Sequence, residues 1–151
     1  MKVIALKGEQ NSGKTTTLSL LRKIMAGKAG FAEDSGTFKD LDNGDFRVVL
    51  LFHQNGKVKK IGIVTQGDYA INYKGKEVSV KSHLDYMKEQ GCDVVVCACT
   101  NGKKKICDAI NIYDPKYITK QRHDNDLRKD TYDNDCASQI LEIVLEMLSS
   151  D

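Results

Sequence analysis

The chain has 151 residues, the size of one ordinary domain and short for two. Hydrophobic residues make up 40% and charged residues 29%, a composition typical of a folded globular protein that argues against a disordered one. The net charge of +2 is too small to indicate a nucleic-acid-binding surface, and no apolar run reaches the roughly 20 residues that cross a bilayer. We therefore expect neither a nucleic acid nor a membrane as a partner.

The chain opens with a strand pattern followed by a helix pattern. Residues 2–7 contain the apolar run VIAL, which predicts a strand buried on both faces of a parallel sheet. This run is too short for a signal peptide, so we expect a cytoplasmic protein. Residues 14–25 carry Leu18, Leu21 and Met25 at helical spacing. Residues 32–44 are acidic, polar and interrupted by glycine, and they are interpreted as a loop.

The middle of the chain predicts a hairpin, a helix and a buried strand. Residues 46–53 and 58–65 are strand-like and are joined by a turn containing Asn55 and Gly56, two residues that tolerate positive φ. We expect these two strands to be antiparallel neighbours. Residues 78–90 have apolar positions typical of a helix, and residues 94–99 form an apolar run typical of a buried strand.

The last third predicts a short helix over residues 103–110 and a weak strand within 112–118. Residues 119–134 carry almost no apolar side chains and are interpreted as a long polar loop, after which Asp135 is the expected N-cap of an amphipathic helix. This order of elements predicts a single α/β domain over residues 1–151. We expect three layers, α/β/α, around a mostly parallel sheet that includes one antiparallel hairpin.

The cysteines do not have the spacing of a metal site. Four of the five lie in or near the apolar run at 94–99, and no close Cys–His pair or Cys-x-x-Cys motif accompanies them. Reduced cysteine behaves as a small core residue, so packing is the favoured interpretation. The residues are Cys92, Cys97, Cys99, Cys107 and Cys136.

A glycine-rich segment lies between the first strand and the first helix and fits the pattern G-x-x-x-x-G-K-[ST] at every fixed position. Glycine allows a tight turn whose successive amide groups point at one anion, and the following helix adds its free N–H groups and positive dipole end. The lysine brings a positive charge to the β- and γ-phosphates, and the threonine hydroxyl is a suitable magnesium ligand. The segment is Gly8, Glu9, Gln10, Asn11, Ser12, Gly13, Lys14 and Thr15, with Thr16 following in the expected binding set.

This segment resembles the Walker A motif of the P-loop nucleoside triphosphatase superfamily. The specific resemblance covers residues 2–25, and the rest of the chain matches only in the order of its elements. It implies a P-loop fold, a bound nucleoside triphosphate and Mg²⁺, with Thr15 as a metal ligand.

The acid that usually follows a neighbouring strand in this superfamily is displaced here. Asp68 follows the strand 58–65 and lies at the correct end of it. The usual acid would fall near Thr65, so Asp68 comes three residues later than expected. We favour Asp68 as the magnesium-side or water-orienting acid, with a turn or N-cap role as the alternative. Asp93 precedes its strand and so lies at the wrong end, and Asp114 is a third choice.

Two further features suggest a catalytic role beside the phosphates. Gln66 is a candidate for orienting an attacking water, and Gly67 for a close backbone approach to the γ-phosphate. Arg122 and Arg128 lie in the polar segment 119–134, which is interpreted either as a lid over the phosphates or as a solvated surface loop. No role is assigned to His53 or His83.

The base is expected to be adenine, because no Asn-Lys-x-Asp pattern for guanine follows a late strand. Three functions remain open. The first is a small Mg²⁺-dependent ATPase. The second is a small-molecule or nucleoside kinase that uses residues 119–134 as a lid over an acceptor. The third is a nucleotide-binding regulatory module with little turnover, acting on a protein partner.

Overall fold

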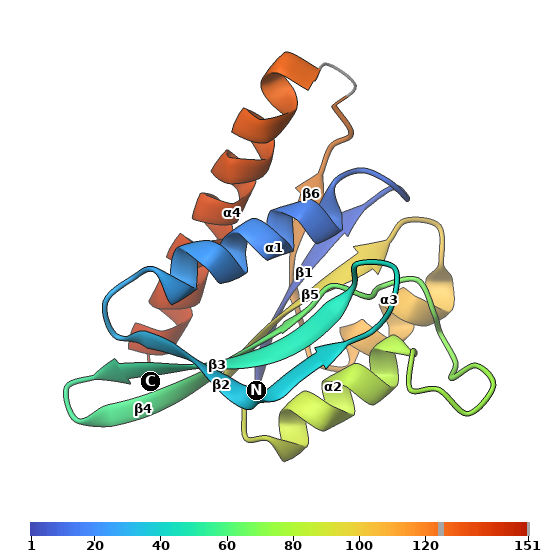
Figure 1. Cartoon of the computed structure of the whole chain (residues 1–151). Coiled ribbons are helices and arrows are strands. Elements are labelled where there is room, and N and C mark those ends of the chain that lie inside the picture. The colour runs from blue at the N-terminus through green and yellow to red at the C-terminus, as the bar shows by residue number, and fades with distance from the viewer. Residues whose placement is uncertain (124–125, 151) are drawn as a thin grey trace.

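The computed structural model describes residues 1–123 and 126–150. Strands and helices follow one another along the chain in ten elements, shown in Figure 1. They are β1 (Lys2–Gly8), α1 (Lys14–Ala26), β2 (Phe31–Asp40), β3 (Phe46–Gln54), β4 (Lys57–Val64), α2 (Val80–Glu89), β5 (Val94–Thr100), α3 (Lys104–Asn111), β6 (Lys116–Lys120) and α4 (Asp126–Ser149).

The strands form one six-stranded mixed sheet in the order β2-β3-β4-β5-β1-β6. The four strands from β4 to β6 in this order are parallel, whereas β3 is antiparallel to both of its neighbours. β5 is therefore inserted between β1 and β4. Because parallel strands end at the same edge, the segments that follow β1, β4 and β5 meet at that edge, next to the start of α1 (Figure 1). The expected α/β class and the predicted hairpin at 46–65 are confirmed.

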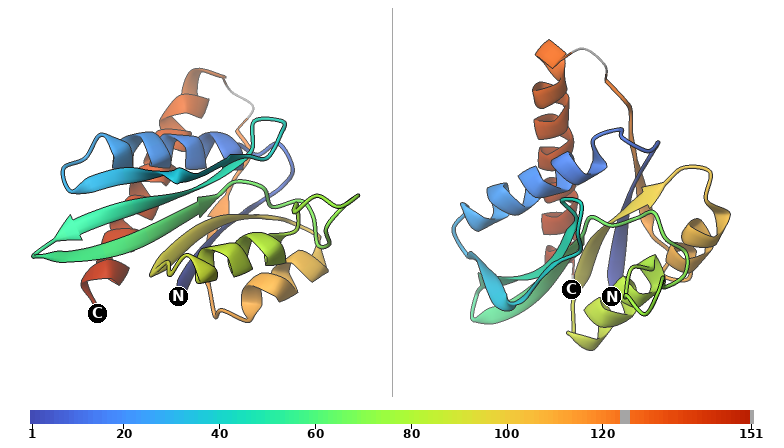
Figure 2. Two further views of the ribbon diagram at one scale, coloured as in Figure 1. Left: turned by 60° about the horizontal axis from the view of Figure 1, so that its bottom comes forward. Right: turned by 45° about the vertical axis from the view of Figure 1, so that its right-hand side comes forward.

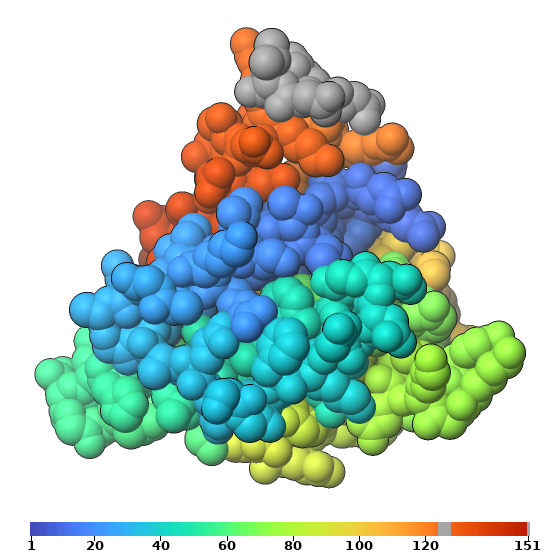
Figure 3. All heavy atoms as spheres, viewed as in Figure 1, coloured from blue at the N-terminus to red at the C-terminus, as the bar shows by residue number. Residues whose placement is uncertain are grey.

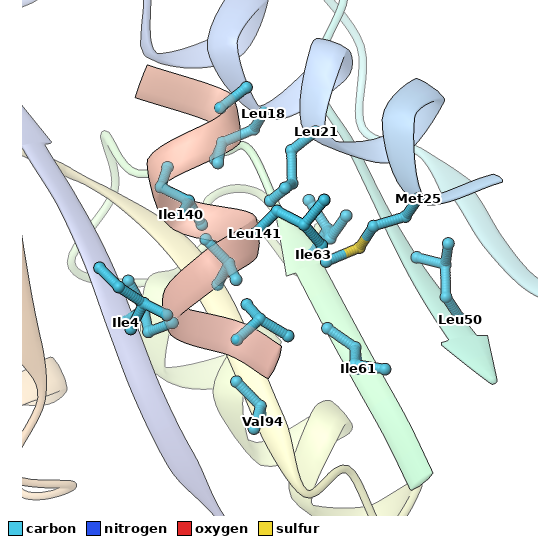
Figure 4. Packing of buried hydrophobic residues seen from close by; sticks show 14 of the residues in the cluster. Ile4, Leu18, Leu21, Met25, Leu50, Ile61, Ile63, Val94, Ile140 and Leu141 are labelled. Atoms are coloured by element: carbon cyan, nitrogen blue, oxygen red, sulfur yellow. The ribbon is translucent and has the colours of Figure 1, made fainter. Parts of the chain in front are cut away.

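Helices cover both faces of the sheet, as the two further views show (Figure 2). On one face α1 and α4 pack against each other and against the sheet through a core that includes Ile4, Leu21 and Ile140 (Figure 4). On the other face α2 and α3 bury a second core that includes Val95 and Ile106. The alternation of Val3 and Ile4 between the two cores confirms that β1 is buried on both sides.

The segment 32–44 is not the loop that its composition predicts, because most of it forms β2. This strand pairs only with β3, and its register shifts between Asp34 and Lys39. An edge strand needs few apolar residues, and here Phe31 and Thr37 are its buried members. Backbone pairing with β3 therefore overrides a polar sequence. Figure 3 shows the outer surface of this region, where α1 lies between α4 and the strands β2 and β3.

The prediction of a polar loop over residues 119–134 is also wrong. Thr119 and Lys120 end β6, and α4 already begins at Asp126, so Asp135 lies inside the helix instead of capping it. The first turns of α4 lack an apolar stripe because the side chains described there are mostly exposed, with the exception of Asp133. Periodicity alone does not detect such a solvated extension. Residues 124 and 125 of the predicted loop lie outside the described residues.

α2 spans Val80–Glu89 and β5 is buried along its whole length, in agreement with their predictions. The last strand, β6, starts later than the strand predicted within 112–118 and extends beyond it. Cys92, Cys97 and Cys99 are buried in the core on the α2–α3 side, as expected for packing residues. Within the described part of the chain, no helix combines the length and apolar character that a membrane crossing requires.

Candidate functional site

The glycine-rich segment makes a tight turn between β1 and α1. Gly13 has a φ of 95° immediately before the helix, a left-handed conformation that glycine adopts without strain. At Gly8 a side chain is excluded for another reason, because an added Cβ would lie 2.8 Å from the carbonyl oxygen of Lys120 and 2.6 Å from the Ser12 hydroxyl. Both fixed glycines of the motif are therefore required by the local geometry.

Lys14 is the buried cation of this turn. Its Nζ donates to the carbonyl oxygens of Gly8 at 3.0 Å and Glu9 at 2.7 Å, so the side chain folds back across the loop. Burial lowers the pKa of Lys14, and the nearby carboxylates of Asp68 and Asp45 act in the opposite direction. An anion bound beside this ammonium would favour its charged form.

The turn borders a pocket of about 520 Å³. Three separate parts of the chain line it: the turn with the first residues of α1, the loop between β2 and β3, and the segment that follows β4. A single residue of α4 completes the wall. The lining residues are Gln10, Asn11, Gly13, Lys14, Thr15, Thr16, Asn43, Asp45, Thr65, Gln66, Gly67, Asp68, Tyr69 and Lys129.

Asp45 connects two threonine hydroxyls at the mouth of α1. The Thr15 hydroxyl donates to Asp45 Oδ1 at 3.1 Å, and the Thr65 hydroxyl donates to the same oxygen at 2.8 Å. Burial raises the pKa of Asp45, and the two hydroxyl hydrogen bonds partly offset that rise. Two hydroxyls and a carboxylate on one side of the pocket form a set of hard oxygen donors, the kind that binds magnesium.

The sequence analysis missed Asp45, although a signal for it exists. Asp42, Asn43 and Gly44 all have positive φ, which forms a tight turn and places Asp45 directly before β3. Asn-Gly before an apolar run is the same hairpin signal that located the turn at residues 55 and 56. Applied to residues 43 and 44, it would have predicted a second hairpin with Asp45 near the end of β4. Thr65, at the place where an acid was sought, holds this carboxylate instead.

Asp68 lies in the pocket, as its position after β4 predicted. Its Oδ1 accepts from the Thr100 hydroxyl at 2.6 Å, and its carbonyl oxygen accepts from Lys103 Nζ at 2.9 Å. Gly67 makes this approach possible, because an added Cβ would lie 2.3 Å from the carbonyl oxygen of Ala98 on β5. The segment after β4 thus runs tightly against the end of β5.

Gln66 lines the pocket, and its amide oxygen faces the buried His83. Its Oε1 lies 2.8 Å from Nε2 of His83 on α2, and its Nε2 donates to the Leu41 carbonyl at 3.4 Å. His83 is completely buried, and its Nδ1 lies 3.2 Å from Nη1 of Arg47 on β3. Sequence reasoning assigned His83 no role, because a histidine on a helix carries no signal of the partner that the fold provides.

The other candidates are placed apart from the pocket. Arg122 and Arg128 are exposed and do not line it, whereas Lys129 of the same segment does. Asp93 accepts from the amide of Lys60 at the opposite end of β5, as its order in the sequence predicted. Asp114 lies before β6 and also does not line the pocket.

A buried ion pair lies under the glycine turn. Lys120, the last residue of β6, donates from Nζ to Asp133 Oδ1 on α4 at 2.9 Å, and both side chains are less than 5% exposed. An added Cβ on Gly13 would lie 3.1 Å from the same Asp133 oxygen. The first turns of α4 are therefore tied to β6 and packed directly against the turn.

Comparisons with protein-family models, with curated proteins and with solved structures find no match to this chain.

The ion pair gives a stability prediction. In Asp133→Leu the ammonium of Lys120 stays buried without its partner, which should lower the free energy of unfolding by about 3–5 kcal/mol. The double variant Lys120→Met/Asp133→Leu has no buried charge at this place and should be more stable than Asp133→Leu alone. Urea denaturation measures both, with Asp135→Leu on an exposed face of α4 as the control. A double variant less stable than the single one would contradict the pairing.

Proposed function

We propose that this chain binds Mg²⁺-ATP in the pocket at the start of α1 and hydrolyses the γ-phosphate. The observation that carries the proposal is the meeting of Lys14, Thr15 and two carboxylates, those of Asp45 and Asp68, around one pocket. These groups come from three places in the sequence, and the glycine turn borders the same pocket.

The turn and the helix start supply the contacts for the phosphate tail. The first N–H groups of α1 have no partner within the helix, and its dipole places positive charge at the same end. Lys14 adds a formal charge that burial keeps out of water. A glycine turn, a helix start and a buried ammonium beside one pocket are suited to two or three linked phosphates better than to a single carboxylate.

The donor set beside Thr15 fits magnesium. Among the described residues no group of three or more His, Cys, Asp or Glu side chains stands ready to hold a metal ion. Magnesium, however, is held in phosphate-transfer sites by one or two protein oxygens, with phosphates and waters completing the octahedron. We assign that role to Thr15 and Asp45, whose side chains are hydrogen-bonded to each other, and Asp68 lines the same pocket. When bound, the ion would neutralise charge that develops on the β- and γ-phosphate oxygens.

Hydrolysis needs a water held in line with the bond between the γ-phosphorus and its bridging oxygen. Asp68 is the carboxylate we assign to this water, because its Oδ1 is held by Thr100 and its backbone by Lys103. The water oxygen bonds to the γ-phosphorus as the bridging bond breaks, releasing ADP and inorganic phosphate. The ammonium of Lys14 stabilises the negative charge that develops on the leaving phosphate.

A kinase remains the second candidate because Lys129 brings a cation from the segment 119–134 to the pocket wall. Lys129 lies in the helical start of α4, so most of the described part of that segment belongs to a helix and not to a loop. An acceptor would have to enter beside Lys129. A regulatory module with little turnover is the third candidate, favoured by Thr65 at the place of the usual acid.

One assay separates these functions. Phosphate release is measured from ATP and from GTP, with and without Mg²⁺, and then in the presence of a panel of nucleosides and small metabolites. We expect release of inorganic phosphate from ATP that needs Mg²⁺ and no acceptor. ADP formation only with an acceptor would identify a kinase. Saturable binding with neither activity would leave the regulatory module.

Lys14→Ala removes the buried cation of the turn. We expect ATP affinity to fall at least about 100-fold, because an unscreened contact between an ammonium and phosphate is lost. Isothermal titration calorimetry at a fixed Mg²⁺ concentration measures the loss. The control is Lys28→Ala, which removes an exposed lysine after α1 without touching the pocket. Equal affinities in Lys14→Ala and the unchanged protein would defeat the site assignment.

Substitution of Asp68 and substitution of Asp45 should change different kinetic properties. Asp68→Asn should lower kcat by about 100-fold with a much smaller loss of ATP affinity, since it orients the attacking water. Asp45→Asn should instead weaken the binding of Mg²⁺, so that the Mg²⁺ concentration for half-maximal activity rises about 10-fold or more. Asp42→Asn, an exposed acid of the same turn, is the matched control. Parallel losses of affinity and turnover in Asp68→Asn would argue against its role.

A further inference from the structure

His83 sits behind the pocket wall, with no surface of its own exposed. Its two ring nitrogens meet side chains from two different strands or strand ends, Arg47 from β3 and Gln66 from the segment after β4. A buried histidine with both nitrogens engaged has a fixed ring orientation. The question is which nitrogen carries the proton, because that decides what Gln66 offers to the pocket.

The contact with Arg47 determines which ring nitrogen of His83 carries the proton. A guanidinium donates and cannot accept, so the ring nitrogen that faces it, Nδ1, must be the acceptor. A neutral imidazole then carries its proton on Nε2, and this N–H must face an acceptor. Of the two ends of the Gln66 amide, the oxygen is therefore the one turned to His83. The chain of donors runs from Arg47 through His83 to Gln66.

The charges around His83 keep the ring neutral. Burial, together with the positive charges of Arg47 and Lys39, lowers the pKa of His83 to about 4, while the Val78 carbonyl acts in the opposite direction. Arg47 itself is held over the ring of Tyr86 at 3.7 Å and lies 3.6 Å from the exposed carboxylate of Glu77. At neutral pH the ring is thus a neutral donor from Nε2.

We propose that His83 is a positioning residue, which locks the Gln66 amide so that its NH₂ group, and not its oxygen, is available to the terminal phosphate. The amide NH₂ donates to the Leu41 carbonyl at 3.4 Å, a long hydrogen bond that a phosphate oxygen can replace. Leu41 precedes the turn that carries Asp45. When the nucleotide binds, the Gln66 NH₂ group exchanges the Leu41 carbonyl for an oxygen of the γ-phosphate. Because the hydrogen bond to Leu41 is then lost, binding of the γ-phosphate changes the contacts of the β2–β3 loop.

The inference deepens the proposed ATPase and depends on it for its kinetic consequences. The arrangement of protons, in contrast, is a property of the protein without nucleotide. The chain has three histidines, so the ring signals in a long-range ¹H–¹⁵N NMR spectrum are few, and a His83 variant assigns them.

The NMR experiment on the nucleotide-free protein should show His83 as the neutral form protonated on Nε2, unchanged from pH 8 to pH 5. A ring protonated on Nδ1, as would follow if it donated to the Val78 carbonyl, overturns the proposal. So does a ring that becomes doubly protonated near pH 6.5. This result stands or falls without any turnover, so it is distinguishable from a failure of the ATPase assignment.

The kinetic experiment compares two substitutions. His83→Leu removes the donor and leaves the Gln66 amide free to turn, so kcat should fall about 10-fold with KM changed less than about 2-fold. His83→Gln restores an N–H near the position of Nε2 and should return kcat to within about 3-fold of the unchanged protein. A His83→Gln variant no better than His83→Leu would contradict the donor role.

Two controls separate positioning from a general loss of structure. In a Gln66→Ala background His83→Leu should have no further effect on kcat, because the group it positions is absent. Leu84→Ala removes the neighbouring buried side chain of α2, which belongs to the core on the α2–α3 side, and it should lower the melting temperature without lowering kcat. Additive losses in the double variant, or an equal fall of kcat in Leu84→Ala, would refute the inference.

Discussion

Asp45, Asp68, Lys14 and the glycine turn line one pocket, and charges interact strongly in such a partly buried site. Asp45 and Asp68 both favour the charged form of Lys14, but a triphosphate brings more negative charge than one ammonium and one helix end neutralise. In the proposed function, a divalent cation between the carboxylate and the phosphate reduces the repulsion between these negative charges. The pKa of Asp45 is raised because burial removes part of its water, and a cation bound beside this carboxylate would offset that cost.

The order of strands makes this concentration of charge possible. β5 lies between β1 and β4, so the ends of three parallel strands are neighbours. β1 and β4 pass directly into segments that line the pocket, and β5 ends beside them. Gly67 presses against the Ala98 carbonyl, and Thr100 reaches across to Asp68. The antiparallel β3 returns the chain to the same edge, where the turn before it delivers Asp45. Buried pairs then fix the surroundings, Lys120 with Asp133 under the turn and Arg47 with His83 behind the wall.

Local signals predicted the parts of this site that local chemistry defines. The glycine turn, the helix after it and Asp68 were all located from the sequence, because spacing and strand order determine where they lie. The edge strand β2 and the first turns of α4 were not, since each is polar and is held by backbone pairing or by one buried ion pair. Asp45 and His83 were missed for a third reason. Their partners are far away in sequence, and only the fold brings Asp45 to Thr15 or His83 to Gln66.

The most direct test of this account is a crystal structure of the protein with a non-hydrolysable ATP analogue and Mg²⁺. The account predicts the β- and γ-phosphates within the turn, hydrogen-bonded by the amides at the start of α1 and by Lys14. It also predicts the metal ion bound to the Thr15 hydroxyl, on the side of Asp45. A nucleotide bound elsewhere, or a turn whose amides point away from the phosphates, would contradict it.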